Sequence, residues 1–196
     1  MRKRYRVDRM AISGGEATLN HRWLVEFFKE LKGLNPDSKA RLHLDTNATI
    51  LTRERIDDLI EAGVTDIGPD LKALRVETFQ KLTNIQDREL AEKYLNTSWE
   101  AVKYIADNYY PERVFMGVGI PYNRFIHPDL NEIYEIGLKI ASIDPEIQVC
   151  GLDYRPEFRR RDITQPTPEE MMKVKKTLEE AGLKKVIVQT SRGHIG

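Results

Sequence analysis

Cysteine is nearly absent from this sequence of 196 residues, which contains only Cys150. A single cysteine excludes an internal disulfide and any four-thiolate metal site made by this chain alone. Because the stretch around it is apolar, we expect Cys150 to be a small core residue on a buried strand. This shortage limits which cofactors the chain can hold by itself.

Histidine is scarce as well, and the four histidines show no spacing typical of a metal site. We expect His43 to face inward on its strand. We expect the other three to lie at the surface: His21, His127 and His194.

The chain has no excess of charge of either sign and no long apolar run. Thirty-one basic residues balance thirty-one acidic ones, so no net field favours nucleic acid, an acidic membrane or a strongly charged partner. Every apolar segment is far shorter than the ~20 residues of a membrane helix, and residues 1–6 are basic but lack the apolar core of a signal peptide. We therefore expect a soluble, cytoplasmic protein with no membrane segment, and a single domain over residues 1–196.

Strand-like and helix-like segments alternate along the whole sequence. Short apolar runs predict strands at residues 9–13, 41–45, 64–67, 114–120, 147–152 and 186–190. Amphipathic patterns predict helices at 20–34, 52–63, 76–82, 88–109, 130–143 and 168–181. In the fourth helix we expect a break near Asn96 and Thr97, with Ser98 capping the second half.

This alternation is typical of a parallel sheet whose strands are joined by right-handed crossovers. A whole eight-stranded barrel takes ~250 residues. We therefore expect an α/β fold that is either a partial barrel or an open sheet.

The turn after the first predicted strand carries Ser13, Gly14, Gly15 and Glu16. Glycines permit φ above zero and let a ligand approach the bare backbone, and Glu16 adds a carboxylate beside them. An ammonium group can share a backbone carbonyl and a carboxylate, so the turn suits a zwitterionic ligand. By itself the pattern also occurs in ordinary strand-to-helix turns.

Polar residues follow the other predicted strands too, which strengthens the case for a binding site. Parallel strands bring their carboxyl ends to one edge of the sheet, where function sits in such folds. The sets that we expect there are Gly14, Gly15 and Glu16; Asp45, Thr46 and Asn47; Asp70 and Lys72; Pro121 to Asn123; and Asp153 with Arg155.

Three of these motifs, in this order on successive strands, resemble the radical S-adenosylmethionine (SAM) superfamily. They are most similar to the activating enzymes of glycyl-radical proteins, such as pyruvate formate-lyase activating enzyme. The motifs are Ser13-Gly14-Gly15-Glu16-Ala17, Asp45-Thr46-Asn47 and Asp70-Leu71-Lys72. The resemblance, which runs from about Arg9 to Thr190, implies a partial (β/α)6-type barrel. It also implies an oxidoreductase that cleaves SAM to methionine and a 5'-deoxyadenosyl radical, which abstracts hydrogen from a substrate.

The resemblance implies a role for each candidate site residue. The turn from Ser13 to Glu16 would hold the methionyl ammonium, and Asp45, Asn47 and Lys72 would line the cofactor site. Asp45 and Asp70 would also help to hold a monovalent cation, although Asp70 also fits a simple ion pair with Lys72. The backbone around Ile120 would lie against the adenine.

Two positions depart from the family pattern. Arg155 stands where the activating enzymes carry a histidine near the ribose and adenine, and an ordinary exposed arginine fits the position equally well. The family's Asp-Thr-Asn-Gly reads Asp-Thr-Asn-Ala here, so Ala48 predicts that this turn is not strained.

The largest departure is the absence of the family's Cys-x3-Cys-x2-Cys signature, whose thiolates hold a 4Fe–4S cluster. Cys150 alone cannot hold such a cluster. We interpret the sequence as an N-terminally truncated core that lacks the family's first strand and cluster loop. We expect weak or no SAM cleavage by this polypeptide alone.

The resemblance also implies partners. A glycyl-radical protein would be the substrate, and flavodoxin or ferredoxin would supply electrons to the complete enzyme. An uncovered first strand predicts self-association through the sheet edge. Arginines 155, 159, 160 and 161 could guide a partner or RNA, or could simply be solvated.

Three alternative functions stay open at this stage. One is an RNA-modifying radical SAM enzyme, although the neutral charge makes nucleic acid an unfavoured partner. Another is a degenerate, non-catalytic subunit that binds a nucleoside. A third is an ordinary barrel enzyme that binds phosphate, although no glycine-rich loop leads into a basic helix N-terminus.

Overall fold

A computed structural model describes residues 9–35, 37, 39–157 and 160–196, and the chain divides into two compact units. Unit 1 comprises Met1–Pro69 and Thr97–Met116, and unit 2 comprises Asp70–Asn96 and Gly117–Gly196. The basic run at residues 1–6 and Arg159 lie outside the described residues. None of the helices in the described part combines the length and the apolar character that a membrane span needs.

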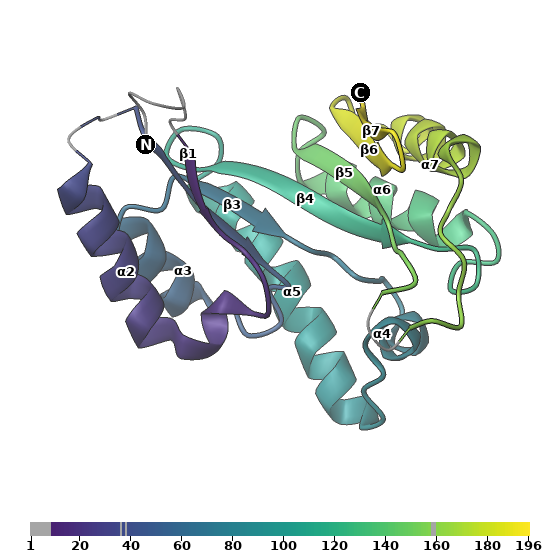
Figure 1. The fold of residues 1–196 in the computed structure, drawn as a ribbon, viewed down its shortest axis with the longest axis horizontal. Coiled ribbons are helices and arrows are strands. Elements are labelled where there is room, and N and C mark those ends of the chain that lie inside the picture. The colour runs from purple at the N-terminus through teal and green to yellow at the C-terminus, as the bar shows by residue number, and fades with distance from the viewer. Residues whose placement is uncertain (1–8, 36, 38, 158–159) are drawn as a thin grey trace. The chain divides into compact units, whose positions relative to one another are not determined.

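Unit 1 contains three parallel strands and the helices that connect them (Figure 1). The elements are β1 (Arg9–Ile12), the short 3-10 helix η1 (Ala17–Asn20), α2 (His21–Leu34), β2 (Arg41–Thr46), α3 (Arg53–Glu61) and β3 (Asp66–Pro69). Neighbouring strands pair with Ile12 opposite Leu44 and Leu44 opposite Ile67. The buried side chains of Leu24 and Phe28 anchor α2, whose first turn is capped by Asn20. Because β1 and β2 run parallel, their C-terminal ends lie at the same edge of the sheet.

Unit 2 continues the same pattern with further parallel strands and an antiparallel end. Its elements are α4 (Val76–Thr83), the first part of α5 (Arg88–Asn108), most of β4 (Phe115–Tyr122), α6 (Asn131–Ile143), β5 (Gln148–Asp153), α7 (Pro168–Glu180), β6 (Val186–Thr190) and β7 (Gly193–Ile195). Strands β4, β5 and β6 run parallel. Thr167 and Glu170 form a capping box that starts α7.

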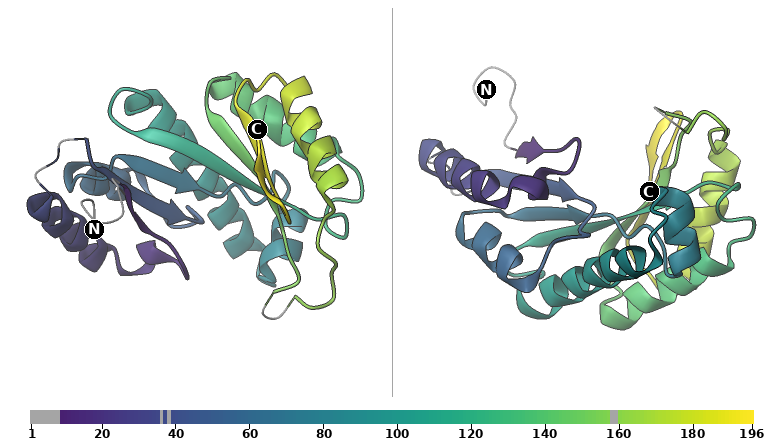
Figure 2. Two further views of the ribbon diagram at one scale, coloured as in Figure 1. Left: turned by 45° about the horizontal axis from the view of Figure 1, so that its top comes forward. Right: turned by 90° about the horizontal axis from the view of Figure 1, so that it is seen from below.

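The structure confirms the α/β class and the six predicted parallel strands, each within a few residues. It adds β7, an antiparallel strand that forms a hairpin with β6 at the C-terminal end (Figure 1 and Figure 2). The predicted break in the long helix is wrong: α5 runs from Arg88 to Asn108 without interruption. Ser98 lies buried inside this helix, so it is not the first residue of a second helix as predicted.

Two predictions of burial need correction. His127 is not a surface residue: it is 2% exposed and its ring stacks on Tyr122. Cys150 lies on β5 as predicted but is only partly buried. Burial, with smaller effects from Asp70 and Asp153, raises the pKa of its thiol to about 11, so the thiolate form is disfavoured.

Candidate functional site

In unit 1 the candidate site starts from the glycine turn after β1. Gly14 has φ +95° and Gly15 has φ +58°, and a Cβ at either position would meet nothing within 4 Å. The glycines are therefore required by backbone conformation rather than by crowding. The space beside the turn is free for a ligand that approaches the main chain.

Glu16 is fixed at this turn by four hydrogen bonds. Its Oε1 accepts from Thr18 N at 3.2 Å, from Thr18 Oγ1 at 2.5 Å and from Thr46 Oγ1 at 2.6 Å. Its Oε2 accepts from Asn47 N at 2.7 Å. Among the described residues, no other donor to Oε2 is found, so this oxygen keeps acceptor capacity for a ligand. The donors come from η1 and from the end of β2, so the carboxylate has one fixed position.

Asp45 lies at the end of β2 on the opposite face from Thr46. His43 Nε2 and Asp45 Oδ1 are 2.7 Å apart. This hydrogen bond, with smaller effects from Ser13 and Arg9, holds the pKa of Asp45 below its usual value despite partial burial. A Cβ on Gly68 would lie 2.7 Å from Asp45 Oδ1, so a side chain at that position would displace the carboxylate. Asp45 also forms a hydrogen bond with Ser13, so Ser13, His43 and Asp45 lie together at this end of the sheet.

The turn after Asn47 corrects the prediction made from Ala48, which adopts a φ of +57° and is fully buried. The backbone N–H of Ala48 donates to Thr46 Oγ1, and its carbonyl accepts from Leu51 N. Asn47 Oδ1 in turn accepts from the N–H and the hydroxyl of Thr49. These bonds hold an alanine in a conformation that favours glycine, so the change from glycine to alanine does not remove the turn.

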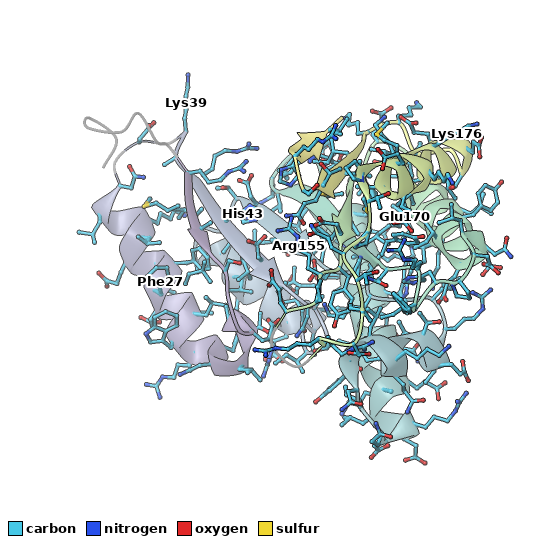
Figure 3. The ribbon with its side chains drawn as sticks, turned by 45° about the vertical axis from the view of Figure 1, so that its right-hand side comes forward. Phe27, Lys39, His43, Arg155, Glu170 and Lys176 are labelled. Carbon is cyan, nitrogen blue, oxygen red and sulfur yellow. The ribbon has the colours of Figure 1, made fainter. Side chains whose placement is uncertain are left out.

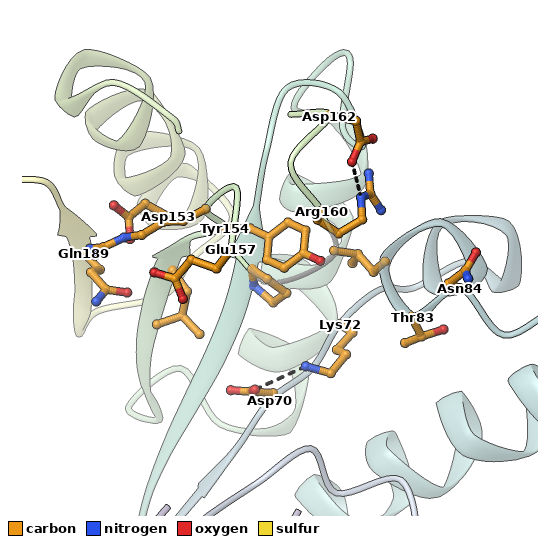
Figure 4. Close-up of a pocket in the computed structure, with 14 residues that line it drawn as sticks. Asp70, Lys72, Thr83, Asn84, Asp153, Tyr154, Glu157, Arg160, Asp162 and Gln189 are labelled. Carbon is orange, nitrogen blue, oxygen red and sulfur yellow. Dashed lines mark hydrogen bonds and ion pairs between the residues drawn. The ribbon is translucent and has the colours of Figure 1, made fainter. Parts of the chain in front are cut away.

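In unit 2 the predicted residues Asp70, Lys72 and Arg155 line one pocket of about 960 Å³ (Figure 4). Lys72 Nζ lies 3.3 Å from Asp70 Oδ2, so these two residues form an ion pair. The rest of the lining comes from the end of α4, from β4, β5 and β6, and from the loop after β5: Leu82, Thr83, Asn84, Pro121, Leu152, Asp153, Tyr154, Glu157, Arg160, Asp162 and Gln189. Its charges are of both signs, as a zwitterionic ligand requires.

Arg155 is held by the buried carboxylate of Asp153. Arg155 Nε donates to Asp153 Oδ1 at 3.1 Å, and Gln165 Nε2 donates to Asp153 Oδ2 at 2.8 Å. The side chain of Asp153 is fully buried, whereas that of Arg155 is 36% exposed. The guanidinium is thus oriented from one side and accessible from the other. Arg160, from the same loop, donates to the carbonyl of Lys81 at the end of α4.

Ile120 differs from the other predicted residues because its side chain is fully buried and does not line the pocket. Its backbone pairs with Gly151 of β5. The preceding residue, Gly119, leaves room for the carboxylate of Asp70, which a Cβ there would strike. Any contact of Ile120 with a ligand would therefore have to use its main chain.

The structure thus sorts the ten predicted residues into two groups. Unit 1 brings together Ser13, Gly14, Gly15, Glu16, Asp45 and Asn47, and unit 2 holds Asp70, Lys72, Ile120 and Arg155. Sequence reasoning missed two residues that hold carboxylates in place. Thr18 donates to Glu16, and Gln165 donates to Asp153. The pattern Glu-x-Thr before a helix is a signal for the first, but Gln165 lies twelve residues from Asp153 in a long loop and no local signal marks it.

The residues present fit one of the two cofactors that the resemblance implies, SAM, and do not fit the other, an iron–sulfur cluster. A fixed carboxylate beside an uncrowded glycine turn fits the ammonium of SAM. No group of three or more His, Cys, Asp or Glu residues in the described part of the chain is placed to hold a metal ion. With one cysteine in the sequence, the residues do not fit an iron–sulfur cluster.

Comparisons with solved structures show similar folds. A domain of pyruvate-formate lyase-activating enzyme from Bacteroides vulgatus aligns with a TM-score of 0.66 and 16% identity, covering 91% of this chain and 97% of that one. Coproporphyrinogen III oxidase (HemN) from Escherichia coli, a radical SAM enzyme, aligns with a TM-score of 0.59 and 15% identity over 90% of this chain and 41% of that one. HydG, a maturase of the FeFe-hydrogenase, aligns with a TM-score of 0.60 and 13% identity over 93% of this chain and 40% of that one.

These similarities confirm the predicted partial barrel of the radical SAM type as the fold class. The chain spans less than half the length of the last two proteins, so the activities of those whole proteins are not assigned to it. A search of curated proteins found no match. The profile of the Radical SAM superfamily matches residues 1–125, well over half of the sequence, and the chain therefore belongs to the Radical SAM superfamily.

Proposed function

We propose that this chain binds SAM and that Glu16 takes the methionyl ammonium of the cofactor. The observation that carries the proposal is the fixed carboxylate at the glycine turn, with acceptor capacity left on Oε2. A charged hydrogen bond of this kind contributes about 1.5–3 kcal/mol. Because Thr18, Thr46 and Asn47 hold the carboxylate before a ligand arrives, little freedom is lost on binding.

The other candidate residues have supporting roles in this proposal. Asp45 keeps its charge to low pH because of His43, and it contributes a second anion near Ser13. For unit 2 the family resemblance implies cofactor contacts from Asp70, Lys72, Arg155 and the backbone of Ile120. The pairing of Arg155 with buried Asp153 orients its guanidinium before any ligand binds.

SAM supplies, on reductive cleavage, a 5'-deoxyadenosyl radical for hydrogen abstraction. We propose an activating-enzyme-like role, with a glycyl-radical protein as substrate and flavodoxin or ferredoxin as electron donor for the complete system. The support is the order of the three motifs and a fold similar to a domain of pyruvate-formate lyase-activating enzyme. Since this sequence cannot ligate the cluster, we expect the purified chain to cleave SAM weakly or not at all.

Calorimetric titration with SAM tests the proposed binding. We expect Glu16→Ala to weaken binding by roughly ten- to hundredfold, which is the loss of one charged hydrogen bond. Glu26→Ala is the matched control, because Glu26 is an exposed acid on α2 whose described partner is Lys29. Failure of the unmodified chain to bind SAM, or equal loss in both variants, would contradict the proposal.

A second candidate function is a non-catalytic subunit that binds a nucleoside, and the lack of cluster ligands favours it. The two candidates separate when SAM-dependent formation of 5'-deoxyadenosine is measured, with a chemical reductant and reconstituted iron and sulfide, on a version of the chain extended upstream by a three-cysteine cluster loop. Product that depends on Glu16 supports the enzyme, whereas binding without product supports the subunit.

A further inference from the structure

The loop that follows β5 forms one wall of the pocket in unit 2. The structure describes residues 154–157 and 160–164 of this loop, and these described residues contain no helix or strand. Arg155, which Figure 3 labels, lies near the start of the loop. Since the loop has no regular backbone hydrogen bonding of its own, contacts with the rest of unit 2 must hold it in place. The loop residues that line the pocket are Tyr154, Arg155, Glu157, Arg160 and Asp162 (Figure 4).

Asn123, directly after β4, closes this loop with one amide group. Its Nδ2 donates to the carbonyl oxygen of Tyr154 at 2.9 Å and to that of Thr164 at 2.8 Å. These two residues are the first and the last of the loop. Asn123 Oδ1 accepts from Phe125 N at 3.0 Å, which fixes the orientation of the amide because its nitrogen then faces the two carbonyls. Both donors of the side chain are therefore used to hold the two ends of the loop together.

The main chain around Asn123 is fixed as well, so its amide is a firm anchor for the loop. The carbonyl oxygen of Asn123 accepts from Ile126 N at 3.0 Å and from His127 N at 2.8 Å. The carbonyl oxygen of the preceding residue, Tyr122, accepts from Tyr154 N at 3.0 Å. Asn123 itself is 0% exposed. Water therefore cannot replace the bonds of the amide, and losing them leaves two loop carbonyls without their partner.

The two carbonyls that Asn123 holds lie next to the residues that orient Arg155. One carbonyl belongs to the residue directly before Arg155, and the other belongs to the residue directly before Gln165. Arg155 and Gln165 are the two side chains that donate to the buried carboxylate of Asp153. If the ends of the loop separate, Arg155 and Gln165 move apart and lose the carboxylate that they share.

Further contacts restrain the loop, but they come from side chains that water reaches. Arg124 Nη2 donates to Thr164 Oγ1 at 2.7 Å, and Arg160 Nη1 donates to the carbonyl oxygen of Lys81 at 2.8 Å. The side chain of Arg124 is 41% exposed and that of Arg160 is 29% exposed. Water can take over either bond at small cost, so the buried amide is the stronger restraint.

We propose that Asn123 is a positioning residue of this pocket, which holds the loop closed and thereby keeps the guanidinium of Arg155 on Asp153 and facing the ligand. Asn123 does not line the pocket, so it acts through Arg155 rather than by contact with the ligand. The expected effect on SAM binding rests on the proposed function, whereas the orientation of Arg155 in the free chain is independent of it.

NMR spectroscopy of the free chain tests the orientation of Arg155. Its Nε–H donates to a fully buried carboxylate, so we expect a signal that exchanges slowly with water and disappears in Arg155→Lys. Asn123→Ser keeps an acceptor for Phe125 N–H but lacks the amide donors, and we expect it to accelerate this exchange by about tenfold. Ile140→Val, a buried substitution on α6 in unit 2, is the matched control and leaves the exchange unchanged.

A double-mutant cycle, measured by calorimetric titration with SAM, tests whether Asn123 acts through Arg155. We expect Asn123→Ser to weaken binding by about tenfold in the unmodified chain and by less than about twofold in the Arg155→Gln background. Equal weakening in both backgrounds shows a merely structural role and overturns the proposal. If the unmodified chain binds no SAM, the proposed function fails, and the NMR comparison decides the positioning of Arg155.

Circular dichroism checks the fold of each variant before the comparison. Asn123→Asp, which also keeps the acceptor and lacks the amide donors, is the second variant. Rapid exchange at Arg155 in the unmodified chain, or unchanged exchange in a folded variant, overturns the proposal. Loss of fold in both variants overturns it as well, because Asn123 is then needed for folding rather than for placing the loop.

Discussion

Ala48 shows at the scale of one residue how local bonds override a backbone preference. Its φ of +57° costs an alanine about 1–2 kcal/mol relative to glycine. The sequence alone suggested the opposite, since alanine avoids this region. What could not be seen in the sequence is the set of bonds from Thr46, Asn47 and Leu51 that holds the turn at the end of β2.

Replacing Ala48 tests this explanation. Ala48→Gly relieves the backbone strain but removes a buried methyl, so we expect the free energy of unfolding to change by less than about 1 kcal/mol. Ala101→Gly, at a buried position in the middle of α5, is expected to cost about 1.3–1.8 kcal/mol, because the lower helix propensity of glycine and the loss of a buried methyl add together. Urea denaturation measures both. Similar losses in the two variants would show that Ala48 is not strained.

His127 makes a second prediction at the residue scale. Burial lowers its pKa, against the opposing effects of Glu132 and Asp129, and Lys81 adds to the lowering. Neither ring nitrogen has a hydrogen-bond partner among the described residues. Because the folded state binds this proton less readily than the unfolded state does, stability is complete above about pH 6.5 and falls as the pH drops below it.

The size of this effect is bounded at about 1.4 kcal/mol per pH unit for one group. We expect His127→Phe, which keeps a ring against Tyr122, to remove that part of the decline between pH 7.5 and pH 5. Denaturant unfolding of the variant and of the unmodified chain at both pH values separates the contribution of His127 from that of the other histidines. An identical decline in the two proteins would contradict the account.

At the scale of elements, the start of α4 depends on one buried carboxylate from α6. Glu132 accepts from the backbone N–H groups of Leu74 and Arg75, each at 2.9 Å, and from Thr78 Oγ1 at 2.6 Å. These groups precede or open the first turn of α4, where donors lack partners within the helix. The end of α4 lines the pocket of unit 2, so this carboxylate helps to position a pocket wall.

Removing this carboxylate should destabilise unit 2. We expect Glu132→Ala to lower the free energy of unfolding by about 2–4 kcal/mol, since it leaves two N–H groups and a hydroxyl without their partner. Glu135→Ala, three residues further along α6, removes an exposed acid that pairs with Arg75 and should cost less than about 1 kcal/mol. Thermal unfolding of both variants makes the comparison, and equal losses would show that α4 does not depend on Glu132.

Elements were predicted well from the sequence where strands and helices alternate with clear apolar patterns. The prediction failed where tertiary contacts determine the secondary structure. Ser98 looks like a cap but is buried in α5, whose apolar face continues through it. Strand β7 has only three residues and forms because Gly193, at φ +107°, turns the chain back onto β6. So short a segment has no periodicity to detect.

At the scale of the whole molecule, the motifs at the strand ends predicted the superfamily, and the profile match confirms it. The sequence predicted Glu16, Asp45 and Arg155 as candidate site residues, but it did not reveal which side chains hold them in place. The position of Glu16 depends on hydrogen bonds from Thr18 and Thr46. Asp45 is held by His43, and Arg155 is held by Asp153. These partners are set by strand register and loop packing, which one sequence does not display.

The central claim is that Glu16 recognises the ammonium of SAM. The most direct test is calorimetric titration of the unmodified chain and Glu16→Gln with SAM and with 5'-methylthioadenosine, which lacks the amino acid part. We predict that Glu16→Gln weakens SAM binding by tenfold or more and leaves the affinity for 5'-methylthioadenosine unchanged. Equal weakening for both ligands would show that Glu16 only supports the turn, and unchanged SAM binding would contradict the claim.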